Sequence, residues 1–138
     1  MNEHQKIIDQ LNVMLRQEHA CAIRYATHAA TITGPASESI RARLMEISAD
    51  EIEHAEKLRD RIIALNGTPT MEISTEDLKA ATNLQDMLRI NIDEERIAIT
   101  TYTEILKNIP HDNAILYHTI WDIIRDEQEH LEELENLM

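Results

Sequence analysis

The sequence of 138 residues contains few of the residues that turn or cross-link a chain. It has two glycines and three prolines, whereas an all-β fold needs many turn residues. Its one cysteine, Cys21, cannot form an intrachain disulfide, so nothing indicates an oxidising compartment. No apolar run reaches the ~18 residues of a membrane span, and the N-terminus does not read as a secretory signal. We therefore expect a helical cytoplasmic protein without a membrane partner.

Basic residues are also scarce. The chain has 13 lysines and arginines against 26 aspartates and glutamates, which gives a formal net charge of −13. This charge repels polyanions, so nucleic acids and anionic membranes are not expected partners, whereas cations are attracted. The length predicts one domain that spans residues 1–138 and has a sizeable core.

Helix-breaking residues divide the chain into four long segments. Residues 33–37 contain Gly34 and Pro35 and predict a turn, and residues 66–69 predict another, with Gly67 as the helix-ending residue. Pro110 ends a third segment, and residues 111–113 can cap the next. The predicted helices cover residues 3–33, 38–65, 82–109 and 112–137. Between the second and third helices lie about 16 mostly polar residues, enough to run the length of a helix bundle.

All four segments carry apolar residues at the alternating 4-3 spacing of an amphipathic helix. The first two stripes consist of Leu11, Leu15, Ala22, Tyr25, Ala29 and Ile32, and of Ile40, Leu44, Ile47, Leu58, Ile62 and Leu65. The other two consist of Leu84, Leu88, Ile92, Ile99, Tyr102 and Leu106, and of Leu116, Ile120, Ile123, Leu134 and Leu137. The middle of every stripe is acidic or imidazole, although this face should be buried: Glu18, Glu51, His54, Glu95, Glu127 and His130.

These polar residues predict a metal site. A buried carboxylate without a partner costs many kcal/mol, far more than the ~1–3 kcal/mol that one apolar core contact contributes. No lysine or arginine is in phase at this level, so two metal cations are the expected compensating charge. Two E-x-x-H motifs, residues 51–54 and 127–130, each place Glu and His on one helix face. Carboxylate with imidazole suits iron, with manganese or zinc as competitors.

The two halves of the chain repeat each other. Residues 18–25 and 95–102 both read Glu-x6-Tyr, and the spacing to the glutamate of the next E-x-x-H motif is 33 residues in one half and 32 in the other. Glu94 would make the spacings equal, but it lies off the apolar stripe and breaks the Glu-x6-Tyr match, so we prefer Glu95. We expect Tyr25 and Tyr102 to be core residues first and hydrogen-bond donors to a ligand second.

At these residues the sequence resembles the ferritin-like di-iron carboxylate proteins, and bacterioferritins most closely. Their bundle takes a single Glu from two helices and Glu-x-x-His from two others. The resemblance implies an all-α, ferritin-like four-helix bundle with one long crossover connection. It also implies two iron ions per chain, with Glu51 and Glu127 as bridging carboxylates. The expected terminal ligands are Glu18, His54, Glu95 and His130.

Two departures from bacterioferritins limit what the resemblance implies. Those proteins bind haem at a subunit interface through a methionine that directly follows the first E-x-x-H glutamate. Here that residue is Ile52, which has no donor atom, so no haem is expected. The family also has a short fifth helix that helps to close a shell of subunits, whereas this sequence has eight residues after His130. A storage shell is therefore not implied, although at least a homodimer is.

The expected function is that of a ferroxidase, which oxidises Fe(II) to Fe(III) at the di-iron centre with O2 or H2O2 for iron storage or detoxification. One alternative is a rubrerythrin-like di-iron peroxidase or oxidase that does not store iron. Another is a metal-free helical scaffold protein. Metal analysis separates the last from the first two, and the sequence leaves open iron versus manganese and the physiological oxidant.

Overall fold

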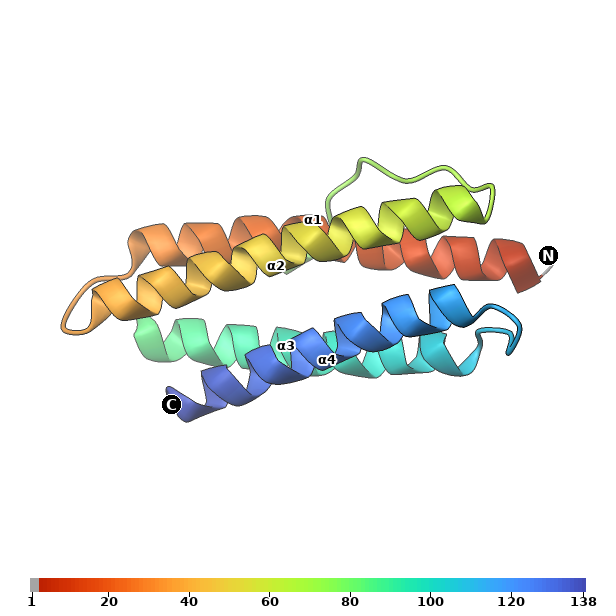
Figure 1. The fold of residues 1–138 in the computed structure, drawn as a ribbon. Helices are drawn as coiled ribbons and strands as arrows, with labels where there is room; N and C mark the ends of the chain where they lie inside the picture. The colour runs from red at the N-terminus through yellow and green to blue at the C-terminus, as the bar shows by residue number, and fades with distance from the viewer. Residues whose placement is uncertain (1–2) are drawn as a thin grey trace.

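The computed structural model describes residues 3–138, which form four long α-helices and no strand. The helices are α1 (Glu3–Thr31), α2 (Ser37–Ala64), α3 (Leu84–Lys107) and α4 (Ala114–Asn136) (Figure 1). Each end lies within two residues of the predicted one. The predicted all-α four-helix bundle is therefore confirmed.

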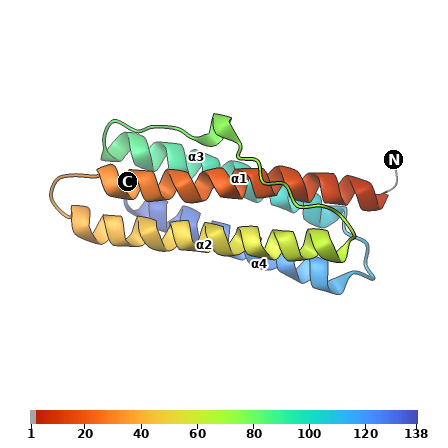
Figure 2. The same ribbon diagram turned by 90° about the horizontal axis from the view of Figure 1, so that it is seen from above.

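The helices are arranged as two antiparallel hairpins. α1 packs along α2 and α3 packs along α4, and the two hairpins lie against each other (Figure 1). The connection from α2 to α3 passes over α1 and runs back along the bundle, so that α2 and α3 point the same way (Figure 2). It contains one 3-10 turn, η1 (Thr75–Asp77). This is the predicted long crossover.

Local residues explain where the helices begin. Gly34 has φ 100° in the turn between α1 and α2, a conformation that glycine adopts without steric cost. The side chains of Asn83 and Asn113 accept hydrogen bonds from backbone N–H groups three residues later, at 2.8 and 3.2 Å. Each asparagine thus satisfies one of the free donors at the start of α3 or α4.

The end of α2 differs from the prediction. Asn66, not Gly67, takes the left-handed conformation, with φ 65°. The N–H groups of Asn66 and Gly67 donate to the carbonyls of Ile63 and Ile62, both at 2.9 Å, which is the pattern of a Schellman motif. Gly67 is required for another reason: a Cβ there would lie 2.7 Å from Cγ2 of Ile8, so α1 leaves no room for a side chain.

A buried polar network attaches the crossover to the bundle. The guanidinium of Arg24 donates to Oδ1 of Asn91 and to the carbonyl of Asp77, both at 2.9 Å. Nδ2 of Asn91 donates to Nδ1 of His28 at 3.0 Å, and Nε2 of His28 donates to the carbonyl of Lys79 at 2.8 Å. The backbone around η1 is therefore held by side chains of α1 and α3.

The apolar core is divided into two parts by the level of the polar residues. One part contains residues 7–15, 55–65, 98–109 and 116–123, and the other contains residues 25–32, 44–47, 87–92 and 131–134. Of the predicted stripes, Ala22, Ile40, Leu84, Ile99 and Leu106 are half-buried and Leu137 is exposed. In α3, Ala98 and Ile105 take the core positions beside Ile99 and Leu106, and α4 ends at Asn136. None of the described helices is long and apolar enough to cross a membrane.

Candidate metal centre

All six predicted ligand residues meet between the two parts of the core, and none is more than 2% exposed. They are Glu18 of α1, Glu51 and His54 of α2, Glu95 of α3, and Glu127 and His130 of α4. The i,i+3 spacing brings Glu and His of each E-x-x-H motif to the same face of the helix.

The side chains form two overlapping groups. One ligand atom each from Glu18, Glu51, His54 and Glu127 lies within 4.8 Å of the others, and so do atoms from Glu95, Glu127 and His130. Glu127 belongs to both groups. Each set of buried oxygens and ring nitrogens can hold a metal ion, and a carboxylate common to both sets can contact two ions at once.

The inner nitrogen of each histidine faces the glutamates. Nδ1 of His54 lies 2.9 Å from Oε2 of Glu18 and 3.3 Å from Oε1 of Glu51. Nδ1 of His130 lies 3.0 Å from Oε2 of Glu95 and 3.2 Å from Oε1 of Glu127. Both inner nitrogens therefore point to the space that the carboxylates surround.

The outer nitrogen of each histidine donates to an aspartate. Nε2 of His54 lies 2.9 Å from Oδ2 of Asp126, and Nε2 of His130 lies 2.9 Å from Oδ2 of Asp50. Each aspartate directly precedes the glutamate of the other helix's motif. His54 of α2 is therefore bonded to Asp126 of α4, and His130 of α4 is bonded to Asp50 of α2. A carboxylate on the outer nitrogen orients the ring and keeps the proton on Nε2, which leaves Nδ1 free for a metal.

Our sequence analysis did not identify Asp50 and Asp126 as site residues. Neither lies on an apolar stripe, and their side chains are 38% and 27% exposed. A signal was nevertheless present, because both motifs read Asp-Glu-x-x-His. An aspartate that precedes the glutamate in both motifs indicates that Asp50 and Asp126 have the same role in the site.

Tyr25 supports one of the glutamates directly. Its Oη donates to Oε2 of Glu95 at 3.1 Å, and the residue is fully buried. The prediction that Tyr25 is a core residue is thus confirmed, and its hydroxyl is bonded to a glutamate of the cluster. Tyr102, its counterpart in the repeat, is equally buried, but its hydroxyl has no hydrogen-bond partner among the described residues.

Burial and mutual repulsion control the charge of the glutamates. Burial, with the negative charge of Glu51, raises the pKa of Glu18 to about 8. The same two causes raise the pKa of Glu95, and they raise that of Glu127 well above its ordinary value. Burial acts in the same direction on Glu51, but the hydrogen bond and charge of His54, the contact with Glu127 and the charge of His130 together lower the pKa of Glu51. Burial and mutual repulsion therefore disfavour the ionised forms of Glu18, Glu95 and Glu127.

The histidines respond in the opposite way. Burial alone would lower the pKa of His54, but its hydrogen bonds to Asp126 and Glu18 raise that pKa to about 12. Burial alone would also lower the pKa of His130, but its hydrogen bond to Glu95 raises that pKa to about 9. A metal ion that binds Nδ1 of either histidine therefore competes with a proton for that nitrogen.

Three carboxylate oxygens in the cluster have no hydrogen-bond partner among the described residues: Oε1 and Oε2 of Glu51 and Oε2 of Glu127. Within residues 3–138, no lysine or arginine forms an ion pair with the four glutamates of the cluster. Arg24 is buried, but its guanidinium donates to Asn91 and to the crossover instead. Unpartnered buried oxygens with no lysine or arginine beside them fit a pair of metal cations.

Glu94 lies outside the cluster. Its side chain is buried, but Oε1 forms an ion pair with Nζ of Lys79 at 2.5 Å. Glu95, one residue later and about 100° further round α3, bonds instead to His130 and Tyr25. As the apolar stripe of α3 predicted, Glu95 faces the cluster and Glu94 does not.

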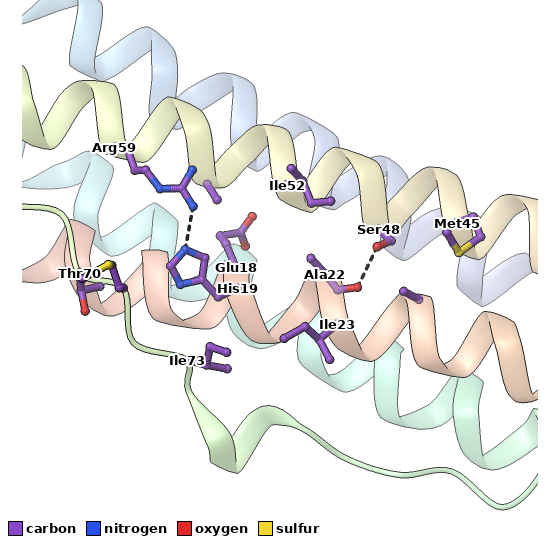
Figure 3. A pocket seen from close by; sticks show the side chains of 13 residues that line it. Glu18, His19, Ala22, Ile23, Met45, Ser48, Ile52, Arg59, Thr70 and Ile73 are labelled. Carbon is purple, nitrogen blue, oxygen red and sulfur yellow. Dashed lines mark hydrogen bonds between the residues drawn. The ribbon is translucent and has the colours of Figure 1, made fainter.

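A groove of about 660 Å3 lies beside the cluster on the outer face of α1 and α2. Glu18 is at its inner side, and Ile23, Met45 and Ile52 supply much of its apolar lining (Figure 3). His19 and Arg59 close one end through a 2.9 Å contact between their side-chain nitrogens.

We expect no tight haem binding in this groove, because the aliphatic side chain of Ile52 offers no ligand atom. The measurement is an absorbance titration of the purified protein with stoichiometric haem. We expect the spectrum of unligated haem, and a Soret band typical of thioether ligation would contradict the prediction.

Comparison with known proteins gives the class. The family model of the ferritin-like domain matches residues 8–138, nearly the whole chain. The protein therefore belongs to the ferritin-like family.

Individual relatives narrow the comparison. The chain is 31% identical over 96 residues to the bacterial ferritin of Pseudomonas aeruginosa, a match that covers 70% of this chain and 61% of that relative. It is 25% identical to a bacterioferritin of Brucella melitensis, covering 98% of this chain and 84% of the relative. Among solved structures, a ferritin-like di-iron carboxylate protein from Bacillus anthracis superposes with a TM-score of 0.92 at 29% identity, covering 99% of this chain and 98% of the other. The resemblance to bacterioferritins is thus confirmed as homology.

Proposed function

We propose that the protein is a ferroxidase that binds two Fe(II) ions per chain and oxidises them to Fe(III) with O2 or H2O2. The observation that carries this proposal is the pair of overlapping, fully buried carboxylate and imidazole groups that share Glu127. Membership of the ferritin-like family supports iron as the metal.

Each residue of the cluster has a proposed role. Glu51 and Glu127 contact both ions, since they lie between the two histidines and carry the unpartnered oxygens. His54 and Glu18 complete one position, and the other position is completed by His130 and Glu95. Nδ1 of His54 lies 2.9 Å from Oε2 of Glu18, and Nδ1 of His130 lies 3.0 Å from Oε2 of Glu95, so small movements of these side chains suffice to admit an ion to each position.

The charge of the site suits a two-ion reaction. Four ionised glutamates carry four negative charges, which two Fe(II) ions neutralise. In the balanced reaction with peroxide, two Fe(II), one H2O2 and two protons give two Fe(III) and two H2O. The iron gains two positive charges, which carboxylates stabilise better than water does in a buried site. Asp50 and Asp126 keep the imidazole rings oriented throughout.

An anaerobic Fe(II) titration tests the proposal. We expect saturation at about two ions per chain, followed by near-ultraviolet ferric absorbance when O2 or H2O2 is added. Comparing the two oxidants at equal concentration identifies the faster one. If Fe(II) binds no better than to a control protein, or is oxidised no faster than in buffer, the proposal fails and a scaffold role becomes the better account.

We also propose that the protein forms at least a homodimer. The groove on α1 and α2 leaves large apolar side chains exposed, among them Ile52 at 56% and Met71 at 94%, and a symmetric contact would cover them. The net charge of −13 opposes association, so we expect the dimer to be stabilised by salt. Analytical ultracentrifugation at micromolar concentration measures this, and a strict monomer would contradict it.

A further inference from the structure

The last part of the crossover is attached to the bundle by hydrogen bonds rather than by packing. Residues 75–80 are exposed or half-buried, and none of them belongs to either part of the core. A hollow of about 210 Å3 lies between this segment and α1 and is lined by residues of both. The backbone is held instead by Arg24 and His28 of α1, whose side chains donate to the carbonyls of Asp77 and Lys79.

Arg24 determines the direction of the hydrogen bonds in this network. A guanidinium only donates, so Nε of Arg24 requires Asn91 to present its Oδ1, which lies 2.9 Å away. The amide nitrogen of Asn91 therefore faces the other way, where it donates to the carbonyl of Met87 at 2.9 Å and to Nδ1 of His28 at 3.0 Å. Because Nδ1 of His28 accepts, the one proton of the ring is on Nε2, which donates to Lys79.

An imidazolium ion at His28 does not fit this network. Its second proton, on Nδ1, would meet the amide protons of Asn91. Rotation of that amide by 180° would direct the same protons at Nε–H of Arg24. His28 is only 2% exposed, so water has little access to solvate the second proton. Protonation of His28 therefore breaks at least one bond of the network.

The surroundings of His28 favour its neutral form. Burial lowers the pKa of His28 from its ordinary value of 6.5, and the positive charge of Arg24 acts in the same direction. The hydrogen bond to the carbonyl of Lys79 and the carboxylate of Asp86 on α3 oppose this shift without reversing it. The network is thus most stable above pH 6.5 and loses stability as the pH falls, because the open form takes up a proton more readily. The other charged side chains beside the network have partners of their own: Asp77 with Ser74, and Lys79 with Glu94.

We propose that Arg24, His28 and Asn91 form a pH-sensitive clamp, which holds the crossover against α1 and α3 near neutral pH and releases residues 75–80 in acid. The clamp joins α1 to α3 as well as to the crossover, so its release also removes a link between the two hairpins. Its hydrogen bonds within residues 3–138 involve none of the six proposed metal ligands, so the clamp is independent of the proposed di-metal site.

Hydrogen exchange of the full chain, measured by mass spectrometry at pH 7.5 and 5.5 and corrected for the intrinsic pH dependence of exchange, tests the clamp. The N–H groups of Ser74, Asp77 and Leu78 are hydrogen-bonded and report its release. We expect the protection of residues 74–80 to fall about 10-fold between the two pH values, relative to that of the core residues of α4. This is the change that uptake of one proton by an ordinary histidine gives over this range.

Three variants identify the group that takes up the proton. His28→Gln has no titrating ring, so the pH dependence should disappear, although protection at pH 7.5 falls because a hydrogen bond is lost. Asn91→Asp supplies a carboxylate that accepts from both Arg24 and the imidazolium ion, so the crossover should stay protected at pH 5.5. His118→Gln removes an exposed histidine and should keep the 10-fold change.

Nitrogen NMR of the imidazole ring gives an independent measurement. At pH 7.5 the ring of His28 should be neutral, with its proton on Nε2. The proposal is overturned if this ring is doubly protonated at pH 7.5, or if His28→Gln retains the 10-fold change in protection. Loss of protection by Asn91→Asp at pH 5.5, to the same extent as in the unmodified protein, would overturn it as well.

Discussion

Replacing either central glutamate, by Glu127→Ala or by Glu51→Ala, should abolish the fast phase of Fe(II) oxidation and reduce the rate to that of Fe(II) in buffer. Both carboxylates lie within 4 Å of both histidines, so each deletion weakens the two iron positions together. His54→Ala or His130→Ala should instead leave one weakly bound ion. Stopped-flow absorbance in the near ultraviolet measures the rate, and anaerobic titration measures the stoichiometry.

Glu53→Ala and Glu129→Ala are the matched controls. Both residues are exposed, and each lies two residues after a central glutamate on the same helix. Each substitution removes one negative charge, as Glu51→Ala and Glu127→Ala do. We expect these variants to keep two ions per chain and the full rate. If they slow the reaction as much as Glu51→Ala and Glu127→Ala do, the effect is one of net charge, and the assignment of the central carboxylates is wrong.

The second large effect concerns two adjacent residues of α3. Glu95→Gln should remove one of the two tightly bound ions, because Oε2 of Glu95 is the oxygen that faces both His130 and Tyr25. Glu94→Gln should leave both ions bound, because the carboxylate of Glu94 is directed to Lys79. Fe(II) or Co(II) titration of the two variants distinguishes them.

The Glu94→Gln variant also has an expected stability. Lys79 is 46% exposed, so the loss of its ion pair should lower the free energy of unfolding by no more than about 1 kcal/mol. Chemical denaturation of the metal-free protein measures this. Loss of an ion from Glu94→Gln with retention of both in Glu95→Gln would show that the third-helix ligand is Glu94.

The pattern of residues along the chain was enough to predict the helices and the level of the site. A helix repeats every 3.6 residues, so the apolar stripes define the buried face. The stripe, together with the Glu-x6-Tyr repeat, favoured Glu95 over Glu94, and the structure places Glu95 among the cluster residues. The two E-x-x-H motifs were equally visible, because residues three apart share a face.

Contacts between helices could not be predicted in the same way. The pairing of His54 with Asp126 joins residues 72 apart in the chain, and that of His130 with Asp50 joins residues 80 apart. Neither aspartate is in phase with an apolar stripe, so periodicity did not identify them. The left-handed conformation of Asn66 was also missed, and so was the reason for Gly67, where a side chain would clash with Ile8 of α1.

The sequence by itself therefore determined the four helices, their buried faces and the six polar residues on those faces, because each of these depends on residues within one or two helical turns. Only the tertiary structure decided which carboxylate each histidine contacts, that the hydroxyl of Tyr25 has a partner, and that the hydroxyl of Tyr102 has none within residues 3–138. These depend on the rotation and offset of one hairpin relative to the other. Packing of the two core parts sets that offset, and no local spacing along the chain encodes it.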